Sequence, residues 1–139
     1  MANKPTIYAY DGEGIKCAYR NNKWVVCIKN WKPNNDIDGL EHLEIHHTTD
    51  EQFILISGKC IIITADRKDG KFDIHLTEAK KGQLYNVPAE CWFFTIVEKE
   101  TKMMYVQDAG CSTENSEYCK LTPEEISYIQ KLARPMLAD

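Results

Sequence analysis

The stretch GLEHLEIHHTTDEQFILISG, residues 39–58, decides the fold of this chain. Successive side chains of a β-strand point to opposite faces, so the neighbours His46 and His47 are expected to face opposite ways. Residues 53–56 are apolar and typical of a strand, and Ser57-Gly58-Lys59 bends the chain toward a second apolar run. The stretch therefore predicts an antiparallel hairpin directly preceded by imidazole and carboxylate groups.

Similar strand patterns extend outward from this stretch over most of the chain. Turn signals separate them: Asn21-Asn22 can adopt positive φ in a tight hairpin, and residues 68–71, KDGK, resemble a type I′ turn. Short strands joined by hairpins predict an all-β barrel or sandwich over about residues 6–108. The eight expected strands are 6–10, 15–20, 23–31, 53–56, 60–65, 72–77, 91–98 and 102–108.

The tail, in contrast, predicts a helix over about residues 122–134. Thr122 can cap its first turn, Pro123 suits the first helical position, and Glu125 completes a capping box. Pro135 is expected to end the helix. One apolar face, which should pack on the outside of the barrel or on a partner subunit, is formed by Ile126, Ile129, Leu132 and Ala133.

Residues 39–58 resemble the first motif of the cupin family, G-x5-H-x-H-x3-4-E-x6-G. Gly39 and Gly58 match, and so do His47 and Glu51. Ile45 stands at the position of the first histidine. In cupins the two histidines and the glutamate of this motif project into the barrel.

Residues 82–97 are similar to the second cupin motif, G-x5-P-x-G-x2-H-x3-N. Gly82 and Pro88 match with the correct spacing, while the other positions depart: they hold Glu90, Phe93 and Val97. The resemblance spans nearly the whole chain. It implies a single cupin domain over residues 1–139, an all-β double-stranded β-helix (a jelly-roll barrel) with a short C-terminal helix.

The motifs leave only part of a metal site. A divalent metal in a barrel usually needs three or four protein ligands, and the resemblance supplies only His47 and Glu51. No cofactor is expected, and a divalent metal ion would need atypical ligands. A β-bulge near Ile45 could bring His46 or Glu44 inward. His42 should face outward, as His46 does on a regular strand, and is expected to be a surface or packing histidine rather than a ligand.

Other candidates follow from strand alternation. His47 and Glu51 form a candidate acid/base pair, and the hydroxyl of Tyr85 could reach the mouth of the pocket as a third catalytic group. Possible ligand-binding residues are Gln83, Cys91, Phe93, Tyr105 and Gln107. Trp92 and Phe94 should face outward, where the C-terminal helix, the N-terminal strands or a second subunit would cover them.

Composition limits the partners and the location. The net charge of -4 provides no field that attracts nucleic acid. No apolar run approaches the roughly 18 residues that span a bilayer, and the N-terminus does not resemble a signal peptide. Six scattered cysteines without a C-x-x-C pair are expected to be reduced. We therefore expect a cytoplasmic protein that contacts neither nucleic acid nor membrane.

Three functions agree with these features. The first is a cupin barrel that binds a small polar ligand, such as a sugar or a carboxylate, at a degenerate metal site. The second is a metal-independent sugar isomerase or epimerase that uses His47 and Glu51, since the cupin family includes such enzymes. The third is a metal-dependent enzyme with atypical ligands. Because cupins commonly pair, the resemblance also implies a homodimer.

Overall fold

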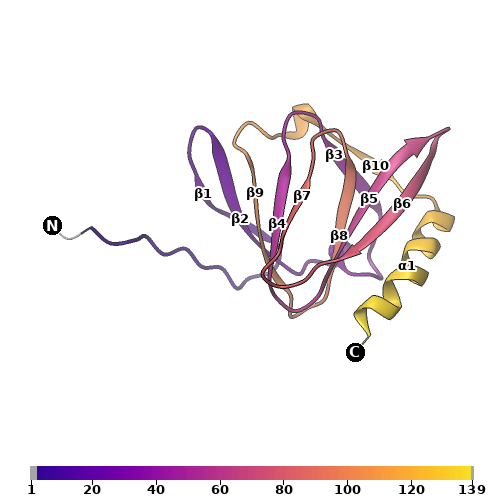
Figure 1. Cartoon of the computed structure of the whole chain (residues 1–139), viewed down its shortest axis with the longest axis horizontal. Coiled ribbons are helices and arrows are strands. Elements are labelled where there is room, and N and C mark those ends of the chain that lie inside the picture. Colours follow the sequence, from indigo (N-terminus) through magenta and orange to yellow (C-terminus); the bar gives the residue numbers. More distant parts are fainter. Residues whose placement is uncertain (1–2, 139) are drawn as a thin grey trace.

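The computed structural model describes residues 3–138, which form two antiparallel sheets and a C-terminal helix (Figure 1). Short 3-10 helices lie at Pro33–Asn35 and Thr113–Asn115. In chain order the strands and the helix are β1 Ile15–Arg20, β2 Trp24–Asn30, β3 His42–His46, β4 Glu51–Ser57, β5 Cys60–Lys68, β6 Lys71–Glu78, β7 Leu84–Val87, β8 Trp92–Val97, β9 Lys102–Asp108, β10 Ser116–Lys120 and α1 Pro123–Leu137.

Each sheet has five strands, in the orders β1-β2-β9-β4-β7 and β10-β3-β8-β5-β6. Neighbouring strands are mostly distant in sequence, as in a jelly roll. The inward faces of the two sheets enclose a core that includes Phe53, whose ring centroid lies 5.9 Å from that of Phe93 and 5.8 Å from that of Tyr105. The expected two-sheet barrel is confirmed.

A second core lies on the outer face of the sheet that contains β3, β8 and β5. Leu43 and Phe94 pack there with Ile129 and Ala133 of α1. Trp92 packs against the same cluster, so the expected cover of these outward aromatic groups by the helix is confirmed. The apolar face of α1 covers one face of β3, so the side chains on the other face of β3 point into the barrel.

Helix α1 begins as expected and ends later. The Thr122 hydroxyl accepts a hydrogen bond from the backbone N–H of Glu125 (3.1 Å), and the Glu125 carboxylate accepts one from the N–H of Thr122 (2.9 Å). The expectation that Pro135 ends the helix is wrong, since Pro135 lies inside it. A proline near the C-terminus removes only one intrahelical hydrogen bond, and the N–H of Ala138 still reaches the carbonyl of Arg134.

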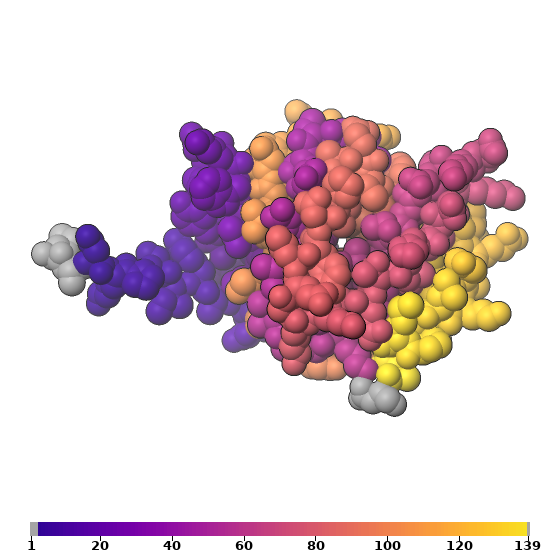
Figure 2. All heavy atoms as spheres, in the orientation of Figure 1, coloured from indigo at the N-terminus to yellow at the C-terminus, as the bar shows by residue number. Residues whose placement is uncertain are grey.

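Two local expectations also fail. Residues 6–10 form no strand; they belong to an N-terminal segment that stands away from the barrel (Figures 1 and 2), and Ile7 is 86% exposed. The Asn21-Asn22 turn forms without positive φ, because the Asn21 side chain accepts hydrogen bonds from the N–H groups of Lys23 and Trp24. The type I′ turn is confirmed by positive φ at Asp69 and Gly70.

Three strands were not expected from the sequence: β3, β7 and β10. They contain only four or five residues each, too few for a clear periodic signal, and β3 and β10 are also rich in polar side chains. Among residues 3–138 no helix has the length and apolar character needed to cross a membrane.

Candidate functional site

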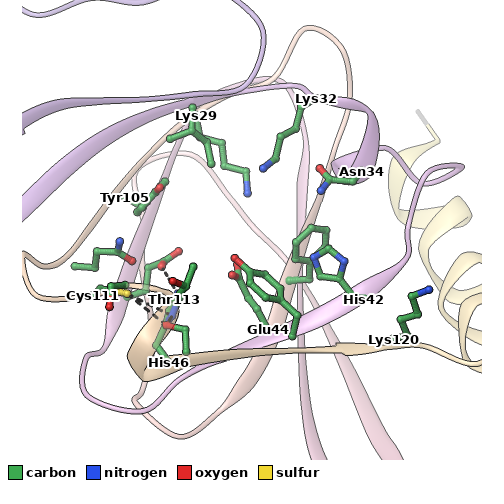
Figure 3. A pocket seen from close by; sticks show the side chains of 17 residues that line it. Lys29, Lys32, Asn34, His42, Glu44, His46, Tyr105, Cys111, Thr113 and Lys120 are labelled. Carbon is green, nitrogen blue, oxygen red and sulfur yellow. Dashed lines mark hydrogen bonds and ion pairs between the residues drawn. The ribbon is translucent and has the colours of Figure 1, made fainter.

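A cavity of about 710 Å³ lies between the two sheets. Strands β2, β4 and β9 of one sheet and β3 and β10 of the other contribute its lining. The lining is rich in titratable side chains, among them Lys29, Lys32, His42, Glu44, His46 and Glu51 (Figure 3). Such a concentration of ionisable groups in a concave site is typical of ligand-binding and catalytic sites.

The polar face of β3 points into this cavity. Strand β3 pairs with β10 so that His42, Glu44 and His46 lie opposite Lys120, Tyr118 and Ser116, and all six side chains line the cavity. Leu43, on the other face of β3, packs in the cluster beneath α1. Burying that apolar residue under the helix directs its polar neighbours toward the barrel interior.

His46 and Glu51 form a nearly buried pair. The imidazole Nε2 lies 3.2 Å from Glu51 Oε1, and the two side chains are 11% and 7% exposed. On the other side of the ring, Nδ1 lies 2.7 Å from Ser116 Oγ and 3.4 Å from Cys111 Sγ. Burial lowers the pKa of His46, but the hydrogen bond to Glu51 and the charges of Glu51 and Glu44 outweigh it and raise the pKa above its ordinary value.

Glu44 places a second carboxyl group on the same side of the cavity. Burial raises the pKa of Glu44, and the nearby charge of Glu51 raises it further. A carboxyl group in this environment retains a proton more readily than an exposed one. Glu44, His46 and Glu51 can therefore donate and accept protons within one small region of the cavity.

Replacing Glu51 by glutamine should lower the pKa of His46. Glu51→Gln keeps the size of the side chain and removes the charge that stabilises the imidazolium, while the opposing effect of burial remains. The pair of His46 and Glu51 contributes its full stability below about pH 6.5, which is the pKa of histidine in the unfolded chain. This contribution is lost as the pH rises through the raised pKa of His46 in the folded protein. NMR titration of the histidine rings measures the shift.

Glu90→Gln is the matched control for that titration. Hydrogen bonds to Glu90 and Glu117 raise the pKa of His47, which should fall in this variant while that of His46 stays unchanged. An unchanged His46 titration in Glu51→Gln would contradict the assignment of this pair.

Lys29 and Lys32 place amines on the opposite side of the cavity from Glu44 and His46 (Figure 3). Lys29 is only 6% exposed, and its Nζ donates a hydrogen bond to Thr95 Oγ1 at 2.6 Å. Burial lowers the pKa of Lys29; Glu51 partly opposes this and Lys32 adds to it. Neither lysine was singled out by the sequence, since one lies within a strand and the other just after it.

Three of the residues expected at the site line the cavity: Glu51, Tyr105 and Gln107. Strands β4 and β9 pair so that Glu51 lies opposite Gln107, and Tyr105 follows on the same face. Burial raises the pKa of Tyr105, so its hydroxyl remains protonated.

The expected inward orientation of His47 is wrong. Strand β3 ends at His46, and His47 lies beyond it at the surface, where its ring contacts Glu90 Oε1 at 3.1 Å and Glu117 Oε2 at 2.5 Å. His46 takes the inward place without a bulge between β3 and β10. The outward placement expected for His42 is wrong for the same reason. Four residues, rather than three, separate the inward histidine from Glu51, a spacing that the cupin motif also allows.

The remaining candidates do not line the cavity. The Tyr85 hydroxyl donates a hydrogen bond to Gln83 Oε1 at 2.8 Å and accepts one from the N–H of Lys80, so it is engaged beside an exposed glutamine. Phe93 is buried in the barrel core, and Cys91 packs against that core. Phe93 and Cys91 were expected to face inward and they belong to the barrel core, but neither lines the cavity.

The donor set does not fit a resident metal ion of the cupin type. Within residues 3–138, no three His, Cys, Asp or Glu side chains are placed to hold one. His46 and Glu51 converge, but Phe93, at the position of the third histidine in the motif, provides no lone pair and packs against Phe53.

Comparisons with known proteins place the fold. No family model and no curated protein matches the sequence. Among solved structures, Streptomyces Pac13, described as a unique nucleoside dehydratase, is similar with a TM-score of 0.58 and 9% identity over 87% of this chain and 96% of that one. A Pac13 variant was solved with uridine.

Two further structures are similar. CapF matches with a TM-score of 0.57 and 17% identity over 86% of this chain and 36% of its own. A cupin-2 domain protein from Shewanella frigidimarina is 17% identical, with a TM-score of 0.48 over 70% of this chain and 82% of its own. The two sheets, their strand order and the likenesses to Pac13 and CapF agree: this chain has the fold of a small cupin, a jelly-roll barrel with one C-terminal helix.

Proposed function

We propose that the cavity binds a small polar molecule that carries both hydroxyl groups and an acidic group, such as a sugar acid. The separation of the amines from the carboxyl and imidazole groups across the cavity carries this proposal. Lys32, with Lys29 beside it, suits a carboxylate, and Glu44 with His46 on the other side suits hydroxyl groups (Figure 3).

Two acceptors in the cavity lining support a hydroxylated ligand. Asn34 Oδ1 and Gln107 Oε1 are buried and accept no hydrogen bond from residues 3–138. A buried acceptor without a donor costs about 1–3 kcal/mol, and a hydroxyl group of a ligand would satisfy it.

A panel of matched sugars tests this function by thermal shift and calorimetry. Glucuronate and galacturonate should stabilise the protein, while glucose and galactose, which lack the carboxylate, should have a much smaller effect. At 100 times its dissociation constant a ligand adds about 2.7 kcal/mol to the free energy of unfolding. Uridine, the ligand of the Pac13 structure, belongs in the panel as a hydroxylated molecule without an acidic group.

Variants locate the binding. Lys32→Met and His46→Ala should weaken binding of the acidic sugars at least about tenfold, which corresponds to 1.4 kcal/mol. His75→Ala, on the exposed face of β6, should bind as the parent does. Equal stabilisation of the parent and both cavity variants, or no stabilisation by any acidic sugar, would contradict the proposed function.

Proton transfer on the bound ligand is the second candidate function. It replaces the pair expected from the sequence, His47 and Glu51, by His46 and Glu51, which lie 3.2 Å apart inside the cavity. Such a pair can remove a proton from one carbon and return it to another, as an isomerase or epimerase does. Exchange of a sugar C–H for deuterium in heavy water, lost in Glu51→Gln, would support it. The homodimer and the cytoplasmic location stay predictions.

A further inference from the structure

Lys29 is buried without a carboxylate partner. Lysine is almost never fully buried unless it is paired. Within residues 3–138 no acidic group lies within ion-pair distance of its Nζ, which donates only to the Thr95 hydroxyl, a group that also accepts from Asn35 Nδ2 at 3.2 Å. The fold thus maintains a costly group at the wall of its cavity.

The surroundings of Lys29 favour a neutral amine. The side chain is buried and points into the cavity beside Lys32 (Figure 3), and these two features outweigh the Phe94 ring, whose centroid lies 5.8 Å from Nζ and which favours the ammonium form. The ionisable groups that face it are Glu51 on β4, Lys32 after β2, Glu44 on β3 and Cys60 on β5. Desolvation and a neighbouring cation are the two features that activate lysine as a nucleophile, since both disfavour the ammonium form.

We propose that Lys29 is a nucleophile that forms an imine with the carbonyl carbon of a small aldehyde or ketone in the cavity, with 2-oxo acids as the best-matched class. This inference rests on the proposed function, because the ligand must enter the same cavity and place its carboxylate near Lys32.

The step is a condensation that needs no oxidant or reductant. The lone pair of the neutral Nζ attacks the carbonyl carbon, and the C–O π electrons accept a proton to give a hydroxyl group. The nitrogen gives up one proton, a second proton converts the hydroxyl group to water, and the nitrogen lone pair forms the C=N bond as the water leaves. Loss of the second N–H proton then gives the neutral imine, so the two protons gained by the oxygen equal the two lost by the nitrogen. Burial raises the pKa of Glu44, so this group can carry the proton that the oxygen requires, while the nearby pair of His46 and Glu51 can accept the protons that the nitrogen loses.

Reductive trapping tests the imine directly. The full chain is incubated with pyruvate and cyanoborohydride, and the adduct is located by intact mass and peptide mapping. Lys29 should be labelled much faster than the exposed lysines at pH 7, because a lowered pKa raises the fraction of the amine that is neutral and reactive. Lactate, which has the carboxylate and no carbonyl group, should compete.

Matched variants assign the label. Lys29→Met and Lys29→Arg should lose the rapid label, while Lys131→Met, on the exposed face of α1, should keep it. Lys29→Arg retains a cation and should still bind lactate. Labelling of Lys29 no faster than that of exposed lysines, or a rapid label that persists in both Lys29 variants, would overturn the inference.

The same experiment separates this inference from the proposed function. If pyruvate and lactate both stabilise the parent but no rapid adduct forms, the cavity binds acids and Lys29 is only a cation; the inference fails alone. If Lys29 is labelled rapidly while lactate neither competes nor stabilises the protein, the nucleophile stands and the proposed ligand class fails.

Discussion

Phe53→Ala should lower the free energy of unfolding by about 3–5 kcal/mol, the largest effect expected from one substitution in this chain. Phe53 is 1% exposed and touches both sheets: its ring packs on Phe93 of β8 and on Tyr105 of β9. Alanine would leave a cavity that the surrounding strands can fill only in part. Chemical denaturation monitored by circular dichroism measures the loss.

Ile54→Ala is the control, because Ile54 follows Phe53 on the same strand and points outward with 36% exposure. Its loss should be much smaller, about 1 kcal/mol or less. Similar losses in the two variants would mean that the barrel core is not organised around Phe53.

Lys29→Met should stabilise the protein by about 1–3 kcal/mol at pH 7. Methionine fills a similar volume, removes the buried amine and leaves the Thr95 hydroxyl with its hydrogen bond from Asn35. The gain should also depend on pH. Because the folded pKa of Lys29 is lowered, the unfolded chain binds a proton that the folded chain lacks at pH values between the folded pKa and about 10.4.

The direction in which pH changes the stability difference between the two proteins follows from the lowered pKa of Lys29. The stability of the parent rises with pH through that window relative to Lys29→Met, so the advantage of the variant should be largest at the acid end and shrink toward pH 10. Urea denaturation of both proteins between pH 6 and 10 measures it. Lys131→Met, an exposed lysine, should show no such trend. A constant difference across this range would contradict a lowered pKa at Lys29.

A gain in stability from removing Lys29 would have a functional meaning. Groups that destabilise a fold persist where binding or catalysis needs them. A Lys29 variant that is more stable and no longer forms the imine would show that this residue lowers stability and is needed for function.

The sequence alone determined the architecture of this protein. Alternating apolar side chains and turn residues predicted most of the strands, including β1 and β9 with their observed bounds, because these signals are local. The capping box predicted the first turn of α1, and the motif placed Glu51 in the cavity. Strands β3, β7 and β10 were not predicted, because such short strands are specified by the strands they pair with rather than by a periodic pattern of their own.

Only the tertiary structure decided which side chains form the site. Alternation along β3 shows that His46 and His47 face opposite ways but cannot say which one faces the cavity. The contact of Leu43 with the cluster beneath α1, about 80 residues later in the chain, decides this. The meeting of Lys29 with Glu44 and His46 likewise depends on packing one sheet against the other. Local patterns specify where strands form, whereas the face of a strand that points inward is specified by what packs against its opposite face.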